Sequence, residues 1–294
     1  MYKIVRLAGI VFAAGAFLIS CTLPSLLVMD PVLYGFQGKV STRHSSTVVL
    51  DGQYPWEQEL HQAVASREGI KSVILSPLLD QAGRAAAIDH PSLDFYLIGS
   101  DRPPGNEEAP ENYAYIAIDR TAAIEQLANI LIQYMQTIDV SSSEDVHLTL
   151  LLYTGTERRR RESDLLQSLL SDVPADRIRV REYESLSSRR GIVTEIGKAA
   201  DTNPHLLVAL LGSHSPNAIR MAVENDVFVF SENVSEAQQL TPLLVGGIET
   251  NFDAAVSSVV RSINRAHAVV LPAADFWISP ATEFPSKYFM PDDR

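Results

Sequence analysis

The sequence feature that most restricts the fold is a repeated alternation between short apolar runs and longer segments with helical spacing. TVVL (47–50) precedes PWEQELHQAVASREG, and SVILS (72–76) precedes PLLDQAGRAAAIDH. Alternation of this kind is typical of βα units in a parallel sheet. Strands that are apolar at nearly every position need cover on both faces, and helices on the two sides of the sheet provide it. The sequence therefore predicts an α/β protein.

The alternation occurs in two halves, which SSSED (141–145) separates. The first half continues with DFYLIG (94–99), YAYIAID (113–119) and a helix whose apolar residues share one face. The second half repeats the scheme with five further apolar runs: VHLTLLLYTG (146–155), RIRVREY (177–183), HLLVALLG (205–212), VFVFSE (227–232) and PLLVGGI (242–248). We therefore predict two doubly wound parallel-sheet lobes joined by a hinge.

The N-terminus has the layout of an export signal. A basic start is followed by an apolar run over 7–19, which is short for a membrane-spanning helix of about 20 residues. LISC (18–21) resembles the bacterial lipobox, in which the cysteine sulfur receives a diacylglycerol and becomes the mature N-terminus. We therefore expect a lipoprotein signal peptide at 1–20 and lipidation of Cys21. The alternative is an uncleaved anchor helix with an incidental cysteine.

Both alternatives place the rest of the chain outside the cytoplasm, and the first makes it lipid-anchored in the bacterial cell envelope. The expected location is the periplasm or the outer face of the cytoplasmic membrane, with the outer membrane also open. Cys21 is the only cysteine, so no disulfide can form within one chain. The formal net charge of −12 disfavours binding to nucleic acid and to anionic headgroups, so the lipid is the expected membrane link.

Motifs of catalysis are weak in this sequence. GSHSP (212–216) does not fit the G-x-S-x-G elbow of hydrolases, and VGGIETN (245–251) lacks the spacing and the lysine of a phosphate-binding loop. The seven histidines are scattered, without the paired spacing of metal ligands. We therefore expect no enzyme activity, no metal and no cofactor. A hydrolase is the remaining enzyme alternative, although no nucleophile–base pair is evident.

Three segments resemble the type I periplasmic substrate-binding proteins, and among them the basic membrane protein lipoproteins that bind purine nucleosides. The segments are SVILSPLLDQAGRAAAIDHPSLDFYLIGSD (72–101), LLGSHSPNAIRMAVENDVFVFSE (210–232) and TPLLVGGIETNFDAAVSSVVRSI (241–263). The resemblance covers roughly 47–270. It implies that the chain crosses between the lobes three times, near 140–147, 246–251 and 267–272.

The resemblance also implies domain boundaries. After the signal peptide we expect three parts: a lipidated tether at 21–46, lobe 1 at 47–145 plus 250–267, and lobe 2 at 146–249 plus 268–294, which includes a C-terminal tail. The family opens with a strand and a loop rich in Asp, Gly, Asn and aromatic residues, whereas this chain has only VMDPVLYGFQGKV (28–40). TVVL then reads as the second strand, and the first βα unit is expected to be shortened or missing.

Ligands of open parallel sheets meet the loops after the carboxyl ends of the strands. The candidate ligand-binding residues in these loops are Tyr54, Ser76, Asp101, Asp119, Tyr153, Ser213, His214, Glu232 and Asn251. The tyrosines offer rings that stack on a base or a sugar face, and the other side chains offer hydrogen bonds. Each candidate also has a structural interpretation: Ser76 as a helix cap, the aspartates as turn formers, and His214 as a loop residue without a ligand.

The interpretation that we favour is a substrate-binding component of an ABC-type importer, which binds a nucleoside or sugar-like molecule between its lobes. Its partners would be this small ligand, an ABC permease or another envelope protein, and the membrane through the lipid anchor, but not nucleic acid. The alternative is a lipoprotein that kept the fold, lost ligand binding and serves as an interaction or regulatory partner. The basic run Arg158–Arg161 is interpreted as a solvated helix start, with a docking spot for a partner as the alternative.

Overall fold

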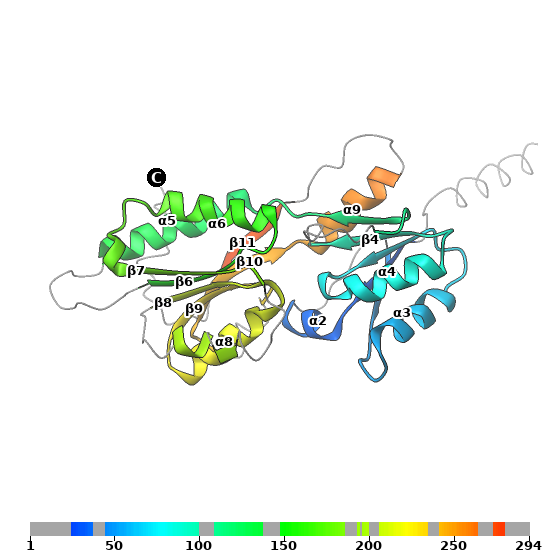
Figure 1. The fold of residues 1–294 in the computed structure, drawn as a ribbon, viewed down its shortest axis with the longest axis horizontal. Helices are drawn as coiled ribbons and strands as arrows, with labels where there is room; N and C mark the ends of the chain where they lie inside the picture. The colour runs from blue at the N-terminus through cyan, green and yellow to red at the C-terminus, as the bar shows by residue number, and fades with distance from the viewer. Residues whose placement is uncertain are drawn as a thin grey trace, which may run out of the picture.

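The computed structural model describes residues 25–37, 45–99, 109–137, 148–185, 193–194, 196–199, 206–234, 241–263 and 273–279. They form two α/β lobes that lie end to end along the long axis of the molecule (Figure 1). No helix in these ranges is long and apolar enough to span a membrane. The predicted signal peptide, Cys21, Asp101 and residues 280–294 lie outside the described residues.

Lobe 1 is built on a five-stranded parallel sheet with the strand order β2-β1-β3-β4-β5. The strands are β1 (Ser25–Met29), β2 (Ser45–Val49), β3 (Ser72–Leu75), β4 (Asp94–Ile98) and β5 (Tyr113–Ile116). The helices are α2 (Pro31–Gln37), α3 (Trp56–Ala65), the short 3-10 helix η1 (Pro77–Leu79), α4 (Asp80–Asp89) and α9 (Phe252–Ile263). One core forms between the sheet and α3 and α4, and a second core forms between the sheet and α9.

Strand β1 shows why this sheet needs helices on both faces. Leu26 and Val28 belong to the core beneath α3 and α4, whereas Leu27 and Met29 belong to the core beneath α9. All five residues of β1 are buried, and the strand pairs with β2 on one side and β3 on the other. Residues 25–37 are therefore part of lobe 1, where a tether was expected. The first βα unit is present in shortened form, with the seven-residue helix α2.

Lobe 2 is built on a six-stranded sheet with the order β11-β10-β9-β8-β6-β7, in which only the pairing of β10 with β11 is antiparallel. The strands are β6 (Leu148–Tyr153), β7 (Ile178–Tyr183), β8 (Leu206–Leu210), β9 (Phe228–Glu232), β10 (Leu244–Thr250) and β11 (Ala274–Ile278). The helices are α5 (Thr121–Thr137), α6 (Glu157–Leu169), the 3-10 helices η2 (Ala175–Arg177) and η3 (Gly212–His214), and α8 (Ser215–Glu224). Helices α5 and α6 cover one face, and α8 covers the other.

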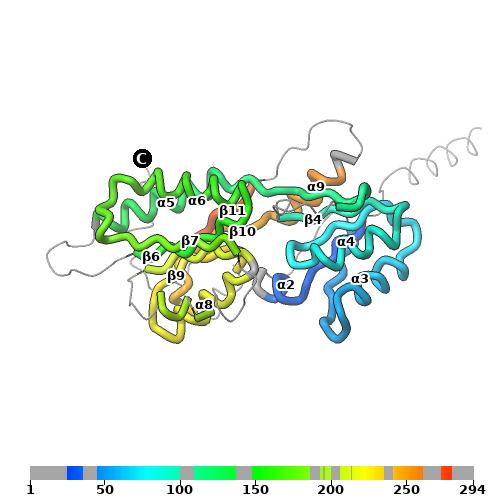
Figure 2. The backbone as a smooth tube through the Cα atoms, viewed as in Figure 1, coloured from blue at the N-terminus to red at the C-terminus, as the bar shows by residue number. Residues whose placement is uncertain are grey.

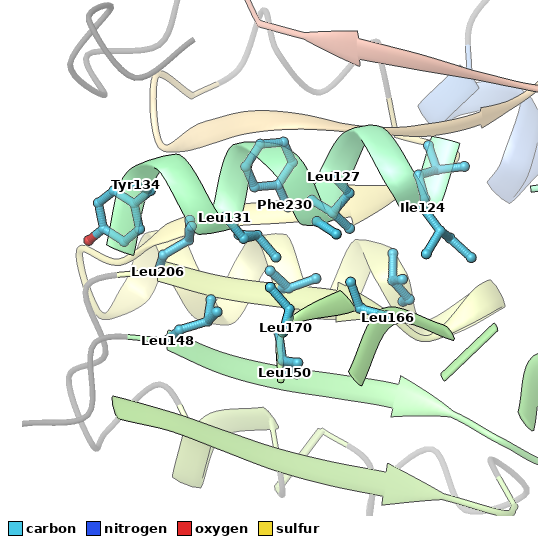
Figure 3. Packing of buried hydrophobic residues seen from close by; sticks show 14 of the residues in the cluster. Ile124, Leu127, Leu131, Tyr134, Leu148, Leu150, Leu166, Leu170, Leu206 and Phe230 are labelled. Atoms are coloured by element: carbon cyan, nitrogen blue, oxygen red, sulfur yellow. The ribbon is translucent and has the colours of Figure 1, made fainter. Parts of the chain in front are cut away.

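Helix α5 belongs to lobe 2, although the sequence placed residues 121–137 in lobe 1. Its apolar residues Ile124, Leu127 and Leu131 pack over Leu148 and Leu150 of the lobe 2 sheet (Figure 3). The amphipathic pattern predicted the helix correctly but carries no information about which sheet the apolar face covers. The first crossing therefore lies just before α5, near Asp119, instead of near 140–147.

The connections between the lobes meet at one place. The chain leaves lobe 2 after β10 and enters α9 of lobe 1 at residues 250–252, then returns to lobe 2 as β11 (Figure 2). The backbone N–H of Ala274 donates to the carbonyl oxygen of Asp119 at 2.7 Å. The side-chain amide of Asn251 donates to Asp275 Oδ2 at 2.9 Å. The three segments thus form a hydrogen-bonded hinge.

Glu59 stabilises the loop that follows β2. Its carboxylate accepts hydrogen bonds from the backbone N–H groups of Tyr54 at 2.9 Å and Gly52 at 3.1 Å. The Tyr54 N–H is the main cause of a lowered pKa for the Glu59 carboxyl, because these bonds favour its charged form. A lowered folded-state pKa means that the stabilisation is complete above the ordinary pKa of 4.5 and is lost as the pH falls below it.

We therefore expect Glu59→Gln to lower the free energy of unfolding by about 1–2 kcal/mol at about pH 7, and by less at about pH 3. Urea unfolding at the two pH values measures the difference. Glu57→Gln is the matched control, since Glu57 is an exposed carboxylate in the first turn of the same helix. A loss for Glu59→Gln that is the same at both pH values would contradict this account.

Candidate functional site: an interlobe cavity

A cavity of about 310 Å³ lies between the two lobes. Lobe 1 lines it with residues that follow β3 and β4: Pro77, Leu78, Asp80 and Gly99. Lobe 2 contributes mainly polar residues, among them Arg120, Tyr153, Thr156, Arg158, Arg159, Glu162, Glu232 and Asn233. Most of these residues follow the carboxyl ends of parallel strands, which is where open α/β sheets bind ligands.

Glu232 is the centre of the lobe 2 wall. It is the last residue of β9 and is only 1% exposed. Its Oε2 accepts from Arg159 Nη1 at 3.0 Å and Nη2 at 3.1 Å, and lies 2.7 Å from Arg120 Nη1. Its Oε1 accepts from the backbone N–H of Gly212 at 2.5 Å. Burying a carboxylate costs much free energy unless it is paired, and two guanidinium groups pair with this one.

The start of helix α6 brings Arg159 to this carboxylate. The hydroxyl oxygen of Thr156 accepts from the backbone N–H of Arg159 at 3.2 Å and caps the helix. Arg159 and Glu162 are three residues apart, so they lie on the same face, and Arg159 Nη1 is 3.4 Å from Glu162 Oε2. The four arginines of the run Arg158–Arg161 therefore have two different surroundings. Arg160 and Arg161 are exposed and pair with Glu184 and Glu157, which agrees with a solvated helix start, whereas Arg158 and Arg159 line the cavity.

Arg120 joins the hinge to the charged cluster. The residue is 7% exposed, and its Nη1 contacts Glu232 and, at 3.4 Å, Glu162. Its Nε and Nη2 are buried and have no hydrogen-bond partner among the described residues. Two nitrogens without acceptors on a buried cation are costly, because the solvation that they lose is not replaced. Arg120 is therefore the lining residue with the most evident need for an added acceptor.

The lobe 1 wall holds Asp80 in a network of hydroxyl donors. Asp80 Oδ1 accepts from the hydroxyls of Tyr113 at 3.0 Å and Tyr115 at 3.1 Å, and from Arg84 Nε at 3.3 Å. Burial, and then the Asp80 charge, raise the pKa of Tyr113. Both hydroxyls therefore keep their protons and act as donors, which fixes the carboxylate at the start of α4.

The cavity has nearly balanced charge. Its lining contains three arginines, Arg120, Arg158 and Arg159, and four carboxylates, Asp80, Glu162, Glu232 and Glu249. A hydroxyl both donates and accepts hydrogen bonds, so it fits between guanidinium and carboxylate groups. An ion of either sign would meet like charges as well as opposite ones. The lining therefore suits an uncharged polar ligand. In the described part of the chain, no group of three or more His, Cys, Asp or Glu side chains is placed to hold a metal ion.

Two of the sequence-predicted ligand residues, Tyr153 and Glu232, line the interlobe cavity. Asp119 lies at the hinge beside it and lines a neighbouring cavity of about 510 Å³ between the starts of α5 and α6. Asp119 Oδ1 accepts from the backbone N–H of Thr121 at 3.0 Å, and this bond is the main cause of its lowered pKa. Asp119 thus caps the start of α5, which agrees with the structural interpretation.

The other described candidates lie outside the interlobe cavity, and most have structural partners. Ser76 is fully buried and donates to Asp30 Oδ2 at 2.7 Å, which ties β3 to β1. Tyr54 lies in the loop between β2 and α3 and is 55% exposed. His214 lies 3.3 Å from the side-chain nitrogen of Asn217, and Asn251 Oδ1 caps α9. The backbone of Ser213 lies in η3, directly after the cavity residue Gly212.

Comparison with known proteins identifies the fold. No family model and no curated protein matches the sequence. An ABC transporter solute-binding protein from Aeropyrum pernix K1 is similar in structure, with a TM-score of 0.52, 12% identity, and coverage of 85% of this chain and 73% of that chain. A periplasmic solute-binding protein from Actinobacillus succinogenes 130z with bound D-allose has a TM-score of 0.51, 11% identity, and coverage of 87% and 96%.

A LacI transcriptional regulator from a Rhodococcus species is also similar, with a TM-score of 0.52, 12% identity, and coverage of 88% of this chain and 98% of that chain. These similarities confirm the predicted fold class. The chain has the type I periplasmic binding protein fold, with two parallel-sheet α/β lobes. Because solute-binding proteins and transcriptional regulators share this fold, the function has to be argued from the site.

Proposed function

We propose that this protein binds a small uncharged polar molecule between its lobes and serves as the solute-binding component of an ABC-type importer. The observation that carries the proposal is Arg120, a buried hinge residue in the cavity wall with two nitrogen donors, Nε and Nη2, that lack an acceptor among the described residues. A shift of the Arg120 side chain on binding would bring these buried nitrogens to a ligand oxygen, which would complete the guanidinium. The binding energy would then favour the closed state over the open one.

The cavity chemistry favours a sugar-like or polyol ligand. The lining contains both arginine and carboxylate groups, and hydroxyl groups satisfy both. Tyr153 adds a ring that can lie against the apolar face of a sugar or against a base, so a nucleoside remains in the same ligand class. The neighbour from Actinobacillus succinogenes holds D-allose, which supports the sugar-like choice.

A thermal-shift screen of the chain from Thr22 onward, against sugars, polyols, nucleosides and amino acids, tests the proposal. At a ligand concentration about one hundred times Kd, we expect the melting temperature to rise by about 5–10 °C. Arg120→Lys keeps the charge but removes the Nε and Nη2 donors, so it should abolish most of this rise. Arg161→Lys is the matched control, because the Arg161 side chain is exposed and pairs with Glu157. Equal responses of the two variants would exclude the proposed role of Arg120.

The second candidate function is an interaction or regulatory protein that retains the fold without a ligand. The observation that favours it is the mutual neutralisation of Arg120 and Arg159 by Glu232, which leaves fewer groups for a ligand. It predicts that no class of metabolite stabilises the protein and that the protein co-purifies with a component of the cell envelope. The thermal-shift screen therefore separates the two candidates.

We also propose that the protein is a lipoprotein anchored through Cys21 in the cell envelope. The diacylglycerol and an added acyl chain would hold it firmly, because each buried methylene contributes about 0.8 kcal/mol. We expect Cys21→Ser to move the protein from the membrane fraction to the soluble fraction, and to remove the acyl mass from the mature N-terminus in mass spectrometry. A wild-type N-terminus without acyl groups would contradict the anchor.

A further inference from the structure

Two histidines on the surface of lobe 1 are placed as a pair. His61 lies on α3 and His90 directly follows α4, and these two helices lie side by side in lobe 1 (Figure 1). His90 Nε2 is 3.2 Å from His61 Nδ1 at an exposed position. We propose that the pair is a binding site for a divalent transition-metal ion, of the kind that imidazole binds well: Zn²⁺, Ni²⁺ or Cu²⁺.

The separation of the two nitrogens matches a shared ion. Metal–nitrogen bonds to histidine are about 2.0–2.1 Å, so two nitrogens on one ion are about 2.9 Å apart at a right angle and about 3.3 Å apart at the tetrahedral angle. The observed 3.2 Å lies between these values. The ion can therefore enter between the nitrogens while α3 and α4 keep their positions.

The orientation of the rings is also suitable. The ring centroids are 4.9 Å apart and the ring planes differ by 36°. This centroid separation is shorter than a head-on N–H···N contact would give, so the two ring axes meet at an angle, as they do around a common ion. Binding requires the tautomers that carry their protons on His61 Nε2 and His90 Nδ1. In the hydrogen-bonded pair, one of the two facing nitrogens carries a proton. When the ion binds, this proton is therefore replaced by one on the other nitrogen of the same ring.

The remaining coordination positions would be open to solvent. Among the residues with described positions, no third His, Cys, Asp or Glu completes a metal-binding group. Water would fill these positions, as it does at other metal sites with few protein ligands. The bound ion would connect the end of α4 to α3 and stabilise lobe 1, because it binds the folded arrangement and not the unfolded chain. This inference concerns lobe 1 alone and does not depend on the proposed function.

The test is a calorimetric titration of the chain from Thr22 onward, prepared without a histidine tag, with Zn²⁺, Ni²⁺ and Cu²⁺ in turn. We expect one ion per chain and a higher melting temperature. His61→Gln and His90→Gln should each weaken the binding by about tenfold or more and remove the rise in melting temperature, because each leaves a single imidazole. His214→Gln is the matched control and should retain both properties, since His214 lies in lobe 2 beside Asn217.

Three outcomes would overturn the proposal. One is the absence of binding by any of the three ions. Another is wild-type affinity in both His61→Gln and His90→Gln, which would place the ion elsewhere on the chain. The third is a loss in only one of these variants, which would indicate a single imidazole ligand instead of a pair. Circular dichroism of each variant shows whether the fold is retained, and both histidines are on the surface, where substitution is well tolerated.

Discussion

Replacing Glu232 by glutamine is expected to destabilise the protein by about 3–5 kcal/mol, which is a large share of the stability of an ordinary domain. The substitution keeps the shape of the side chain but removes its charge. Arg120 and Arg159 would then remain buried beside a neutral amide, and Glu162 would be the charged partner that they still share among the described residues. Urea unfolding measures the loss, and the same variant should lose any ligand-induced rise in melting temperature.

The control for this prediction is Glu224→Gln. Glu224 forms an ion pair with Arg220 on α8, but both side chains are more than half exposed. Exposed pairs of this kind contribute about 0–1 kcal/mol. If Glu232→Gln lost no more stability than Glu224→Gln, the ion pairs of Glu232 with Arg120 and Arg159 would not stabilise the protein as proposed.

Replacing Leu27 by alanine is the second change with a large expected effect. Leu27 is fully buried in β1 and packs beneath α9 with Ile74 and Val256. Truncation of a leucine in such a core costs about 2–5 kcal/mol, because it removes apolar contacts and leaves a cavity. The loss is measurable by urea or thermal unfolding of the chain from Thr22 onward.

Val32→Ala is the matched control for Leu27→Ala, since Val32 lies on the adjacent helix α2 and is partly exposed. We expect this change to cost about 1 kcal/mol or less. Leu27→Ala also tests the assignment of residues 25–37 to lobe 1. A tether would tolerate the substitution without any loss of stability, so a neutral result would contradict the position of β1 in the sheet.

The fold class was predictable from the sequence because apolar strands and amphipathic helices are local patterns. Strand β1 was missed for a local reason as well. Its apolar run, Leu26–Met29, is only four residues long. It lies between Pro24 and Pro31 and closely follows Cys21, so the local pattern is that of a tether. The lobe to which α5 belongs was not predictable. Its apolar face shows that the helix packs on a sheet, but the choice of sheet depends on contacts with residues more than twenty positions away, such as Leu150.

The site was predictable in its location but not in its chemistry. Strand ends pointed to Glu232 and Tyr153, and both line the cavity. Arg159 stands in a run of four arginines that covers every side of a helix turn, so the sequence could not show which arginine faces the cleft. Ser76 looked like a ligand residue because it follows a strand. Its hydroxyl bonds to Asp30 at the end of β1, a residue 46 positions earlier, and this pairing depends on strand order.

The position of β1 determines how the proposed lipoprotein would stand on a bilayer. Only Thr22, Leu23 and Pro24 separate Cys21 from Ser25, so even a fully extended chain would hold the start of β1 within about 14 Å of the acylated residue. The cleft lies at the opposite, carboxyl ends of the lobe 1 strands. Lobe 1 would thus lie next to the lipid surface. Lobe 2 would lie farther from the bilayer, and it would move relative to lobe 1 as the cleft opens and closes.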